Sequence, residues 1–321
     1  MNLPAFFRIM AAGVLAAVLS LSCHAGDVNP AIPILMFHKV DDQPEDPESI
    51  SPVQLEALFT RMWSMGFCPV NISDILENRV DGIVPAGLKP VGITMDDAHP
   101  SVLFSRSSTP KSGGLKNSRP LVEILHDSLK PFGHAARATI FIGRVWNDRI
   151  STVPGEYFGG YLPLAEALAL LDETPGIEVG YHTVTHKSMG AMGAAETRSA
   201  LEAQREDFAR QGVLENVVPI LAYPYGHRPL PEGLEESRSQ GFLGAVLAFP
   251  GIGEGMYDTL PACEYDGTLL TNPFLIPRVS IGAKAYPYRP ADRNTPFVSL
   301  DPYDDFKKDV LDALPLLYTV P

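Results

Sequence analysis

The sequence predicts an α/β protein folded as a (β/α) barrel of about seven to eight strands. Short apolar or β-branched segments alternate along the chain with amphipathic stretches, which is the order of a parallel sheet with helices packed outside it. About eight such segments within roughly 250 residues is the number that a barrel needs. The expected strands are 32–37, 67–70, 91–95, 138–142, 177–181, 217–223, 242–248 and 276–281.

The composition indicates a folded, acidic chain. The 321 residues are 45% hydrophobic and 20% charged, and the 27 Gly and 30 Pro stay below the share of about 25% that is typical of disorder. The net charge is −13, and no run of basic residues offers a surface for a phosphate backbone. We therefore expect no nucleic-acid partner. The sequence leaves the oligomeric state open.

The N-terminal segment 1–25 is typical of a signal peptide. One arginine precedes an apolar run over 9–21, which is shorter than the roughly 20 residues of a membrane-spanning helix. Small residues at Cys23 and Ala25 indicate cleavage after Ala25. We therefore expect an exported protein, periplasmic or secreted, with no transmembrane span and a single catalytic domain over 26–321. A lipid anchor on Cys23 and a buried N-terminal helix are the alternatives.

Two further features remain open in the sequence. An exported protein permits a disulfide between Cys68 and Cys263, but two buried free thiols are an equally good interpretation. Residues 101–120, rich in serine, glycine and proline, predict a loop insertion directly after the strand at 91–95. Loops of this length are commonly functional, so we expect the insertion to shape access of substrate.

Chemically capable side chains follow two of the expected strands. Asp96 and Asp97 come directly after 91–95, at the strand end where barrel enzymes place catalytic groups. His182 and His186 follow 177–181, and in a helical turn this spacing puts both rings on one face. Two histidines and one carboxylate can hold a divalent ion with positions left for water and substrate, while a second carboxylate supplies a base.

A third strand end adds a possible oxyanion donor. The segment 217–223 runs into the turn Pro224-Tyr225-Gly226. A backbone N–H in such a turn can face the negative charge that develops on oxygen during acyl transfer. An ordinary turn is the alternative interpretation.

With these motifs, the chain resembles the polysaccharide deacetylase family, also called the NodB-homology domain or carbohydrate esterase family four. The matching stretches are 32–40 (IPILMFHKV), 51–52 (SP), 65–67 (MGF), 94–97 (TMDD), 182–186 (HTVTH) and 223–226 (YPYG). The resemblance implies a distorted (β/α) barrel that binds a divalent ion and hydrolyses N-acetyl or O-acetyl groups on a polysaccharide.

The resemblance also implies a role for each matched residue. Asp96 matches the catalytic base, and Asp97, His182 and His186 match the three metal ligands. Tyr225 matches the residue whose backbone N–H binds the oxyanion. Zinc is the expected ion, with cobalt, nickel, manganese and iron as alternatives for imidazole and carboxylate ligands.

Two positions near the motifs depart from the family pattern. Ala98 stands where the family has glycine after the paired acids, and Ala222 stands where many members carry an arginine that orients the base. Arg278, on the last expected strand, is our candidate to reach the base instead. A structural ion pair elsewhere is the alternative for Arg278.

The general acid is a further departure, because the chain has no histidine after His227 to match the family's late histidine motif. Our candidate is His38, since it ends the first expected strand and should open onto the same mouth as the metal. A buried structural histidine is the alternative, and His99 and His227 are further candidates for the acid.

The sequence thus predicts a metal-dependent enzyme that removes N-acetyl groups from a polysaccharide, with N-acetylglucosamine units as the expected substrate. One alternative is an O-acetyl polysaccharide esterase, since a sugar oxygen needs less help from an acid on leaving. A second is a glycan-binding barrel that has lost turnover. A third, a non-haem iron oxygenase, shares the set of two histidines and one carboxylate but does not account for the neighbouring base.

Overall fold

The computed structural model describes the central part of the chain. The described residues are 32–44, 48–97, 99–105, 117–143, 156–157, 162–163, 165, 169, 171, 175–212, 217–248, 262–263, 273–276 and 278–282. The expected signal peptide, Ala98 and residues 106–116 of the expected insertion lie outside them. The division into a signal peptide and one domain stays a prediction.

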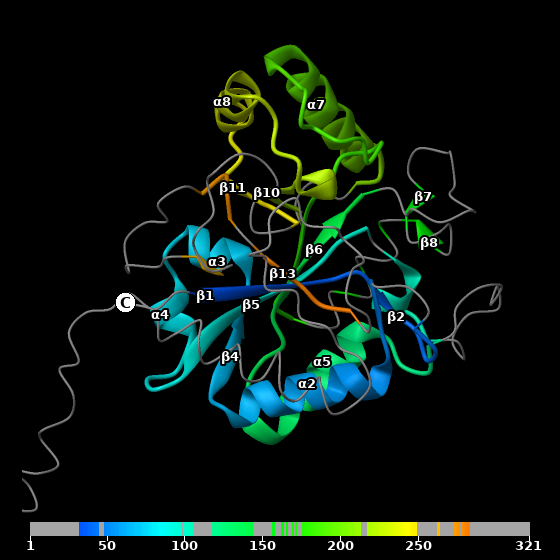
Figure 1. Cartoon of the computed structure of the whole chain (residues 1–321), viewed down its shortest axis with the longest axis vertical. Helices are drawn as coiled ribbons and strands as arrows, with labels where there is room; N and C mark the ends of the chain where they lie inside the picture. The colour runs from blue at the N-terminus through cyan, green and yellow to red at the C-terminus, as the bar shows by residue number, and fades with distance from the viewer. Residues whose placement is uncertain are drawn as a thin grey trace, which may run out of the picture.

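A curled, mainly parallel sheet forms the centre of the molecule (Figure 1). Its path runs β11-β10-β9-β6-β5-β1-β12, and β4 pairs with β5 while β13 pairs with β1. The bounds are β1 (Ile32–Phe37), β4 (Phe67–Val70), β5 (Lys89–Met95), β6 (Ala138–Ile142), β9 (Ile177–Tyr181), β10 (Val217–Ala222), β11 (Gly244–Val246), β12 (Ala262–Cys263) and β13 (Val279–Ser280). The expected strands therefore form as predicted, with the last two shorter than expected.

Three strand pairings go beyond the predicted parallel barrel. Strand β12 pairs with β1 in the antiparallel direction, and the sequence did not predict it. Two small sheets flank the barrel, and their bounds are β2 (Lys39–Val40) with β3 (Ser49–Ile50), and β7 (Glu156–Tyr157) with β8 (Leu162–Pro163). Their two-residue strands are too short to leave a period-2 pattern in the sequence.

The segment 276–281 joins the two ends of the curled sheet. Ile276 bridges Val246 in β11, and its N–H donates to the carbonyl of Ala245. Three residues later β13 begins and pairs with β1, and the N–H of Ile281 donates to the carbonyl of Met36. One short segment thus bonds to both sheet ends, which confirms the predicted distorted barrel.

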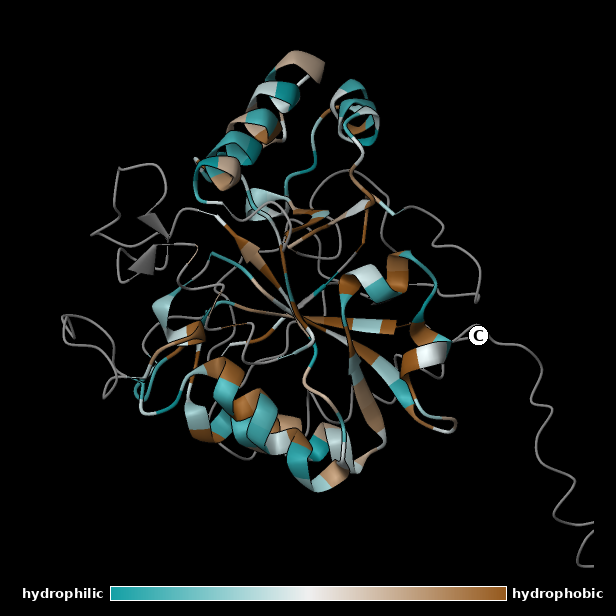
Figure 2. Cartoon of the chain, turned by 180° about the vertical axis from the view of Figure 1, so that it is seen from behind, coloured by the Kyte–Doolittle hydropathy of each residue, from teal (hydrophilic) through white to brown (hydrophobic). Residues whose placement is uncertain are grey.

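Amphipathic helices cover the outside of the barrel. Figure 1 shows α2 (Pro52–Ser64) and α5 (Leu121–Leu129) side by side below the sheet, with α7 (Ala194–Arg210) and α8 (Pro231–Ser239) at the opposite side. Helix α2 begins at a capping box in which the Ser51 side chain accepts from the N–H of Gln54. The hydropathy colouring in Figure 2 shows apolar residues along the faces turned toward the strands. The single-turn elements are η1 (Pro100–Val102), η2 (Lys130–Phe132) and η5 (Pro224–Gly226).

Apolar side chains inside the barrel close its amino-terminal end together with α3 (Ile72–Leu76) and α4 (Val80–Ile83). This inner cluster consists of Ile32, Ile34, Val70, Ile72, Ile75, Val80, Phe141, Ile220, Ala222, Val246 and Ile276. A second, larger cluster lies between the strands and the outer helices. Because α3 and these side chains fill one end, polar groups are left to gather at the carboxyl ends of the strands.

Two sequence questions have structural answers within the described residues. Cys68 is a buried free thiol, and the side chain of Cys263 lies outside the described part of the chain. Among the helices that the structure describes, none combines the length and the apolar character needed to cross a bilayer.

Candidate metal centre

Asp97, His182 and His186 converge beyond the carboxyl ends of β5 and β9. The Oδ1 atom of Asp97 lies 3.1 Å from Nε2 of His182 and 3.0 Å from Nε2 of His186. The two Nε2 atoms are 3.1 Å apart. Only β6 separates β5 from β9 in the sheet, so the ends of these two strands open onto the same place. The three residues that the sequence proposed as metal ligands are therefore brought together.

The backbone turns sharply at this centre. Asp97, Thr183 and His186 have φ values of 69°, 60° and 49°, in the left-handed region that residues other than glycine seldom adopt. The sequence placed both histidines in a helical turn, and this was wrong, because no helix forms over 182–189. The left-handed turns bring the two rings together instead. Such backbone strain concentrates at functional sites.

The ring of His182 is held in one orientation by the main chain of β10. Its Nδ1 donates to the carbonyl of Ala222 at 2.8 Å. With the proton on Nδ1, the lone pair of Nε2 faces Asp97 and His186, which is how a metal-binding histidine is oriented. Ala222 thus contributes a carbonyl at the position where many members of the resembled family carry a basic side chain.

The donor set fits a bound cation. Asp97 Oδ1 is buried and accepts no hydrogen bond within the described part of the chain, although two imidazole nitrogens lie close to it. Three donor atoms about 3 Å apart can all reach one divalent ion at the usual ligand distance of about 2.1 Å. Imidazole and carboxylate together suit divalent transition metals.

The electrostatics of the centre favour positive charge. Burial raises the pKa of Asp97, but its contacts with His182 and His186 outweigh burial and hold the pKa well below the ordinary range. Burial lowers the pKa of His182, while the charges of Asp96 and Asp97 raise it to a net value above the ordinary one. The carboxylates that attract a proton to this place attract a metal cation in the same way.

Asp96 lies beside the three ligands and is clamped by Arg278. Both residues are almost completely buried, at 2% and 0% exposure, and the guanidinium donates to both carboxylate oxygens at 2.6 Å. One of these oxygens, Oδ2, also lies 3.9 Å from Nε2 of His182. The sequence left two interpretations of Arg278 open, a contact with Asp96 or an ion pair elsewhere. The structure shows the contact with Asp96.

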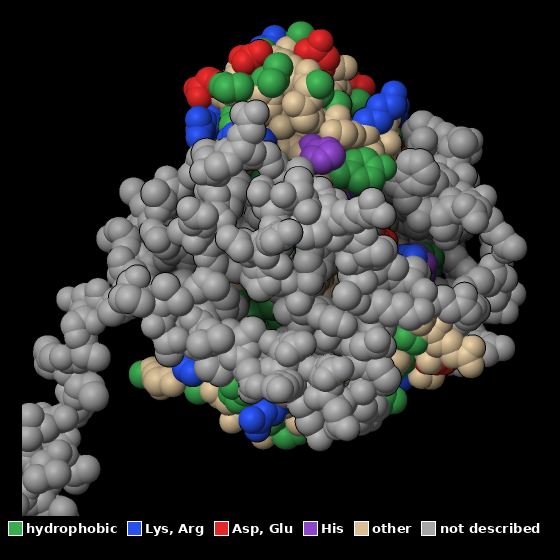
Figure 3. All heavy atoms as spheres, in the orientation of Figure 1, with side chains coloured by type: hydrophobic (Ala, Val, Ile, Leu, Met, Phe, Trp, Pro, Cys, Tyr) green, Lys and Arg blue, Asp and Glu red, His purple; other side chains and the backbone are tan. Residues whose placement is uncertain are grey.

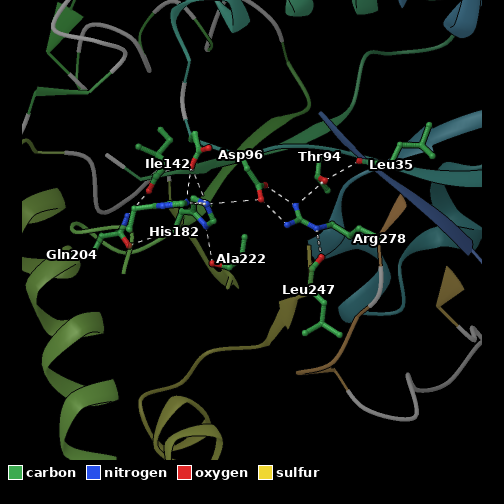
Figure 4. A network of polar contacts seen from close by, with 11 residues as sticks. Leu35, Thr94, Asp96, Ile142, His182, Gln204, Ala222, Leu247 and Arg278 are labelled. Carbon is green, nitrogen blue, oxygen red and sulfur yellow. Dashed lines mark hydrogen bonds and ion pairs between the residues drawn. The ribbon is translucent and has the colours of Figure 1, made fainter. Parts of the chain in front are cut away.

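The guanidinium of Arg278 is itself fixed by two further acceptors, which Figure 4 shows around it. It donates to the carbonyl of Leu247 at 2.7 Å and to Oγ1 of Thr94 at 3.1 Å. The Thr94 hydroxyl in turn donates to the carbonyl of Leu35 at 2.8 Å. Burial raises the pKa of Asp96, but Arg278 and His182 outweigh burial, so the pKa is lowered and Asp96 stays ionised.

His38 and Tyr225 lie at the edge of this centre. The charge of His38 contributes to the lowered pKa of Asp96, and its Nδ1 is buried with no hydrogen-bond partner among the described residues. Tyr225 has a φ of 59°, and its ring centroid lies 4.7 Å from that of His186. Its side chain is 45% exposed, and on the face drawn in Figure 3 histidine and hydrophobic side chains reach the surface beside the α7–α8 end.

The other two histidines proposed as acids are engaged in local contacts. Nδ1 of His99 lies 2.7 Å from the hydroxyl of Ser101, and Nδ1 of His227 lies 2.8 Å from the hydroxyl of Ser188. Neither contact joins these rings to Asp96, whereas His38 acts on that carboxylate. His38 therefore stays the first prediction for the acid.

The residues that fix His182 and Arg278 through hydrogen bonds were not predicted from the sequence. Thr94 stands inside the TMDD stretch, which was the available signal. Gln204 is a polar residue on the buried face of α7, between Leu201 and Phe208, and that position was its only signal. Ala222 and Leu247 accept hydrogen bonds from His182 and Arg278 through main-chain carbonyls. Every residue type has such a carbonyl, so the sequence could not indicate this role.

The comparisons with known proteins give the fold. The chain matches no protein-family model and no curated protein. Among solved structures, it resembles the Streptococcus pyogenes deacetylase PplD in complex with acetate, with 17% sequence identity and a TM-score of 0.51 over 77% of this chain and 92% of that one. It resembles IcaB from Ammonifex degensii with 17% identity and a TM-score of 0.51, over 78% of this chain and 92% of that one.

At this level of identity the likeness concerns the fold alone, and it agrees with the distorted (β/α) barrel predicted from the sequence. The stretches 94–97, 182–186 and 223–226 lie at the carboxyl ends of β5, β9 and β10, around the candidate metal centre.

Proposed function

We propose that this chain is a metal-dependent deacetylase that hydrolyses N-acetyl groups on a polysaccharide containing N-acetylglucosamine. One observation carries the proposal: Asp97, His182 and His186 form a three-ligand set directly beside Asp96, a buried carboxylate held ionised by Arg278. A set of this kind leaves coordination positions open for water and substrate.

Asp97, His182 and His186 would hold the ion, with zinc as first candidate and cobalt, nickel or manganese as alternatives. When bound there, the ion would polarise the acetyl carbonyl and lower the pKa of a bound water. Asp96 then takes the proton of the attacking water, because it is ionised and its Oδ2 faces the centre. Arg278 keeps that carboxylate in place during proton transfer. No covalent intermediate is needed, and the products are acetate and a free amine.

Two residues at the edge complete the proposed reaction. The backbone N–H of Tyr225 donates to the oxyanion of the tetrahedral intermediate, a role supported by its place in the turn next to His186. His38 donates a proton to the leaving nitrogen, supported by its electrostatic contact with Asp96. An amine leaves poorly without a proton, so an acid at this position favours an N-acetyl over an O-acetyl substrate.

The site of action is proposed to lie outside the cytoplasm. The predicted signal peptide supports export, and an extended acetylated polymer is the substrate that such a protein would meet. PplD, which shares the fold, is a deacetylase whose structure contains acetate. Acetate is also the product that the proposed reaction releases.

The proposal is tested by measuring acetate release from chitooligosaccharides, peptidoglycan and acetylated xylan, before and after removal of metal with a chelator. We expect release from the first two, loss of release with the chelator and recovery on adding zinc or cobalt. Release from xylan alone would indicate the O-acetyl esterase. Retention of glycan with no acetate from any polymer would indicate a binding protein, and consumption of oxygen with iron would indicate an oxygenase.

Asp96→Asn separates the base from the metal ligands. We expect acetate release to fall by about 10²–10⁴-fold, the usual contribution of a general base, while the metal content stays that of the wild type. Asp97→Asn should lose the metal as well as the activity. The surface variant Asp127→Asn, on α5, is the matched control and should change neither. Full activity of Asp96→Asn would contradict the proposed role of this carboxylate.

A further inference from the structure

The strands β6 and β9 separate at the point where the metal centre begins. They pair in register from Ala138 with Ile177 to Ile142 with Tyr181, and His182 is the first residue after β9. Beyond this pair the ladder ends, because the chain after Tyr181 turns toward the centre. The N–H of His182 and the carbonyl of Ile142 thus face the gap in which a further ladder bond would lie.

The side-chain amide of Gln204 fills this gap from helix α7. Its Oε1 accepts from the N–H of His182 at 3.2 Å, and its Nε2 donates to the carbonyl of Ile142 at 2.5 Å, as Figure 4 shows. The side chain is fully buried. A primary amide carries a carbonyl oxygen that accepts and an NH₂ group that donates, in the way that a peptide group carries C=O and N–H. Gln204 therefore continues the hydrogen bonding between the separated strands.

The spacing of the strands matters for the ligand because His182 packs directly on the end of β6. A Cβ atom added to Gly143 would lie 3.1 Å from Cβ, Cδ2 and the carbonyl oxygen of His182. The imidazole therefore has little room on this side, and a shift of either strand end would move Nε2. The carbonyl of Ala222 fixes the ring through Nδ1, and Gln204 fixes the backbone that carries the ring.

We propose that Gln204 is a positioning residue for the metal centre, which holds His182 at the place where its Nε2 can bind the ion. The inference rests on the proposed function, since it concerns the same three ligands. Replacing the amide by an apolar side chain leaves the N–H of His182 and the carbonyl of Ile142 buried without a partner. Loss of such a supporting contact behind a ligand typically weakens metal binding by about 10–100-fold.

Gln204→Met is the direct test, because methionine has a similar length and makes neither hydrogen bond. The affinity of the full chain for Zn²⁺ and for Co²⁺ is measured by competition with a chromophoric chelator, and thermal unfolding is measured on the metal-free proteins. We expect the affinity to fall about 10–100-fold. Gln204→Glu keeps the acceptor for the N–H of His182, so it should lose less metal affinity than Gln204→Met. It also serves as the test if the methionine variant does not fold.

Leu201→Ala is the matched control, since Leu201 is also fully buried on α7, one turn earlier, and belongs to the hydrophobic core. It should lower the unfolding temperature with the metal affinity unchanged. Wild-type affinity in both Gln204 variants would overturn the inference alone, as would an equal loss of affinity in Leu201→Ala. A wild-type chain that binds neither ion would overturn the proposed function and this inference with it.

Discussion

At the scale of single residues, the site depends on a buried ion pair. Asp96 and Arg278 are both removed from water, and burying two charges is favourable only when hydrogen bonds satisfy them. Here the guanidinium donates to both carboxylate oxygens, to the carbonyl of Leu247 and to the hydroxyl of Thr94, and these four hydrogen bonds use four of its five N–H donors. The pair therefore keeps the proposed base ionised and in one orientation.

Replacing Arg278 should change the pH dependence of activity. The charge and hydrogen bonds of Arg278 lower the pKa of Asp96 against the opposing effect of burial. In Arg278→Met, burial still raises the pKa of Asp96 and the arginine no longer lowers it. The pKa of Asp96 therefore rises, and the acidic limb of the kcat/KM profile moves to higher pH. Arg278→Lys keeps the charge without the two-point contact and should move the limb less.

The same variant tests the structural side of the ion pair. Removing one partner of a buried pair typically costs about 3–5 kcal/mol in the free energy of unfolding. Urea denaturation of Arg278→Met against the wild type measures this cost. An unchanged acidic limb together with unchanged stability would show that Arg278 does not govern Asp96.

At the scale of elements, the barrel interior is shaped by small residues that let larger ones approach. Gly180 in β9 lies against Phe141 in β6, and the ring of Phe141 lies beneath the guanidinium of Arg278, whose Cζ is 5.5 Å from its centroid. A Cβ at Gly180 would lie 2.7 Å from that ring and 2.9 Å from the carbonyl of Ile220. The glycine thus allows the packing on which the base-holding arginine rests.

Gly180→Ala should therefore destabilise the chain. Overpacking a core position typically costs about 1–3 kcal/mol, and denaturant unfolding measures it. The control is Gly82→Ala in α4, where nothing lies within 4 Å of the added Cβ. Because alanine favours helix by about 1 kcal/mol over glycine, this control should be neutral or stabilising. Equal stability of the two variants would contradict the packing argument.

The amino-terminal end of the barrel holds a second polar cluster, where α3 meets the strands. The buried carboxylate of Glu178 accepts from the N–H and the hydroxyl of Ser73 and from the hydroxyl of Thr139. Asp74 lies nearby and binds Arg79 and Arg137. Burial raises the pKa of Glu178 above its ordinary 4.5, and Asp74 adds to the rise, although these hydrogen bonds oppose it.

A carboxyl group with a raised pKa in the folded chain favours folding in its protonated form. Its contribution is complete below the ordinary value of 4.5 and is lost as the pH rises through the raised folded value. The free energy of unfolding of the wild type should therefore fall, relative to Glu178→Gln, as the pH rises across this window. Urea denaturation at a series of pH values measures the difference, and parallel curves would contradict the raised pKa.

The sequence predicted those parts that leave a local pattern. Asp97, His182 and His186 were found because their residue types and their places after expected strands both point to metal binding. Arg278 was proposed from its strand alone, but its pairing with Asp96 depends on how the barrel closes. Gln204 was missed because a single polar residue on a helix does not say which strand end it meets, and β12 was missed because two residues carry no periodicity.

At the scale of the whole molecule, the closure of the barrel assembles the site. Segment 276–281 bonds to β11 and β1, and this places Arg278 on Asp96 across 182 positions of sequence. The proposed metal ligands follow β5 and β9, which belong to the same curled sheet. The site thus exists only in the folded chain, so an ion that binds there should stabilise folding as a whole.

Metal should accordingly raise the stability of the full chain. A ligand that binds only the folded state at 100 times its Kd adds about 2.7 kcal/mol to the free energy of unfolding. We expect the unfolding temperature to rise with added zinc in the wild type and to stay constant in His186→Ala. A rise of equal size in that variant would place the bound metal elsewhere.

The most direct test of the central claim is a titration of the metal-free wild-type chain with zinc, with bound metal and acetate release from chitooligosaccharide followed together. Binding and release should rise in step and saturate at one ion per chain, and Asp97→Ala should show neither. Acetate release that persists in the metal-free chain, or tight binding of the ion by Asp97→Ala, would contradict the account.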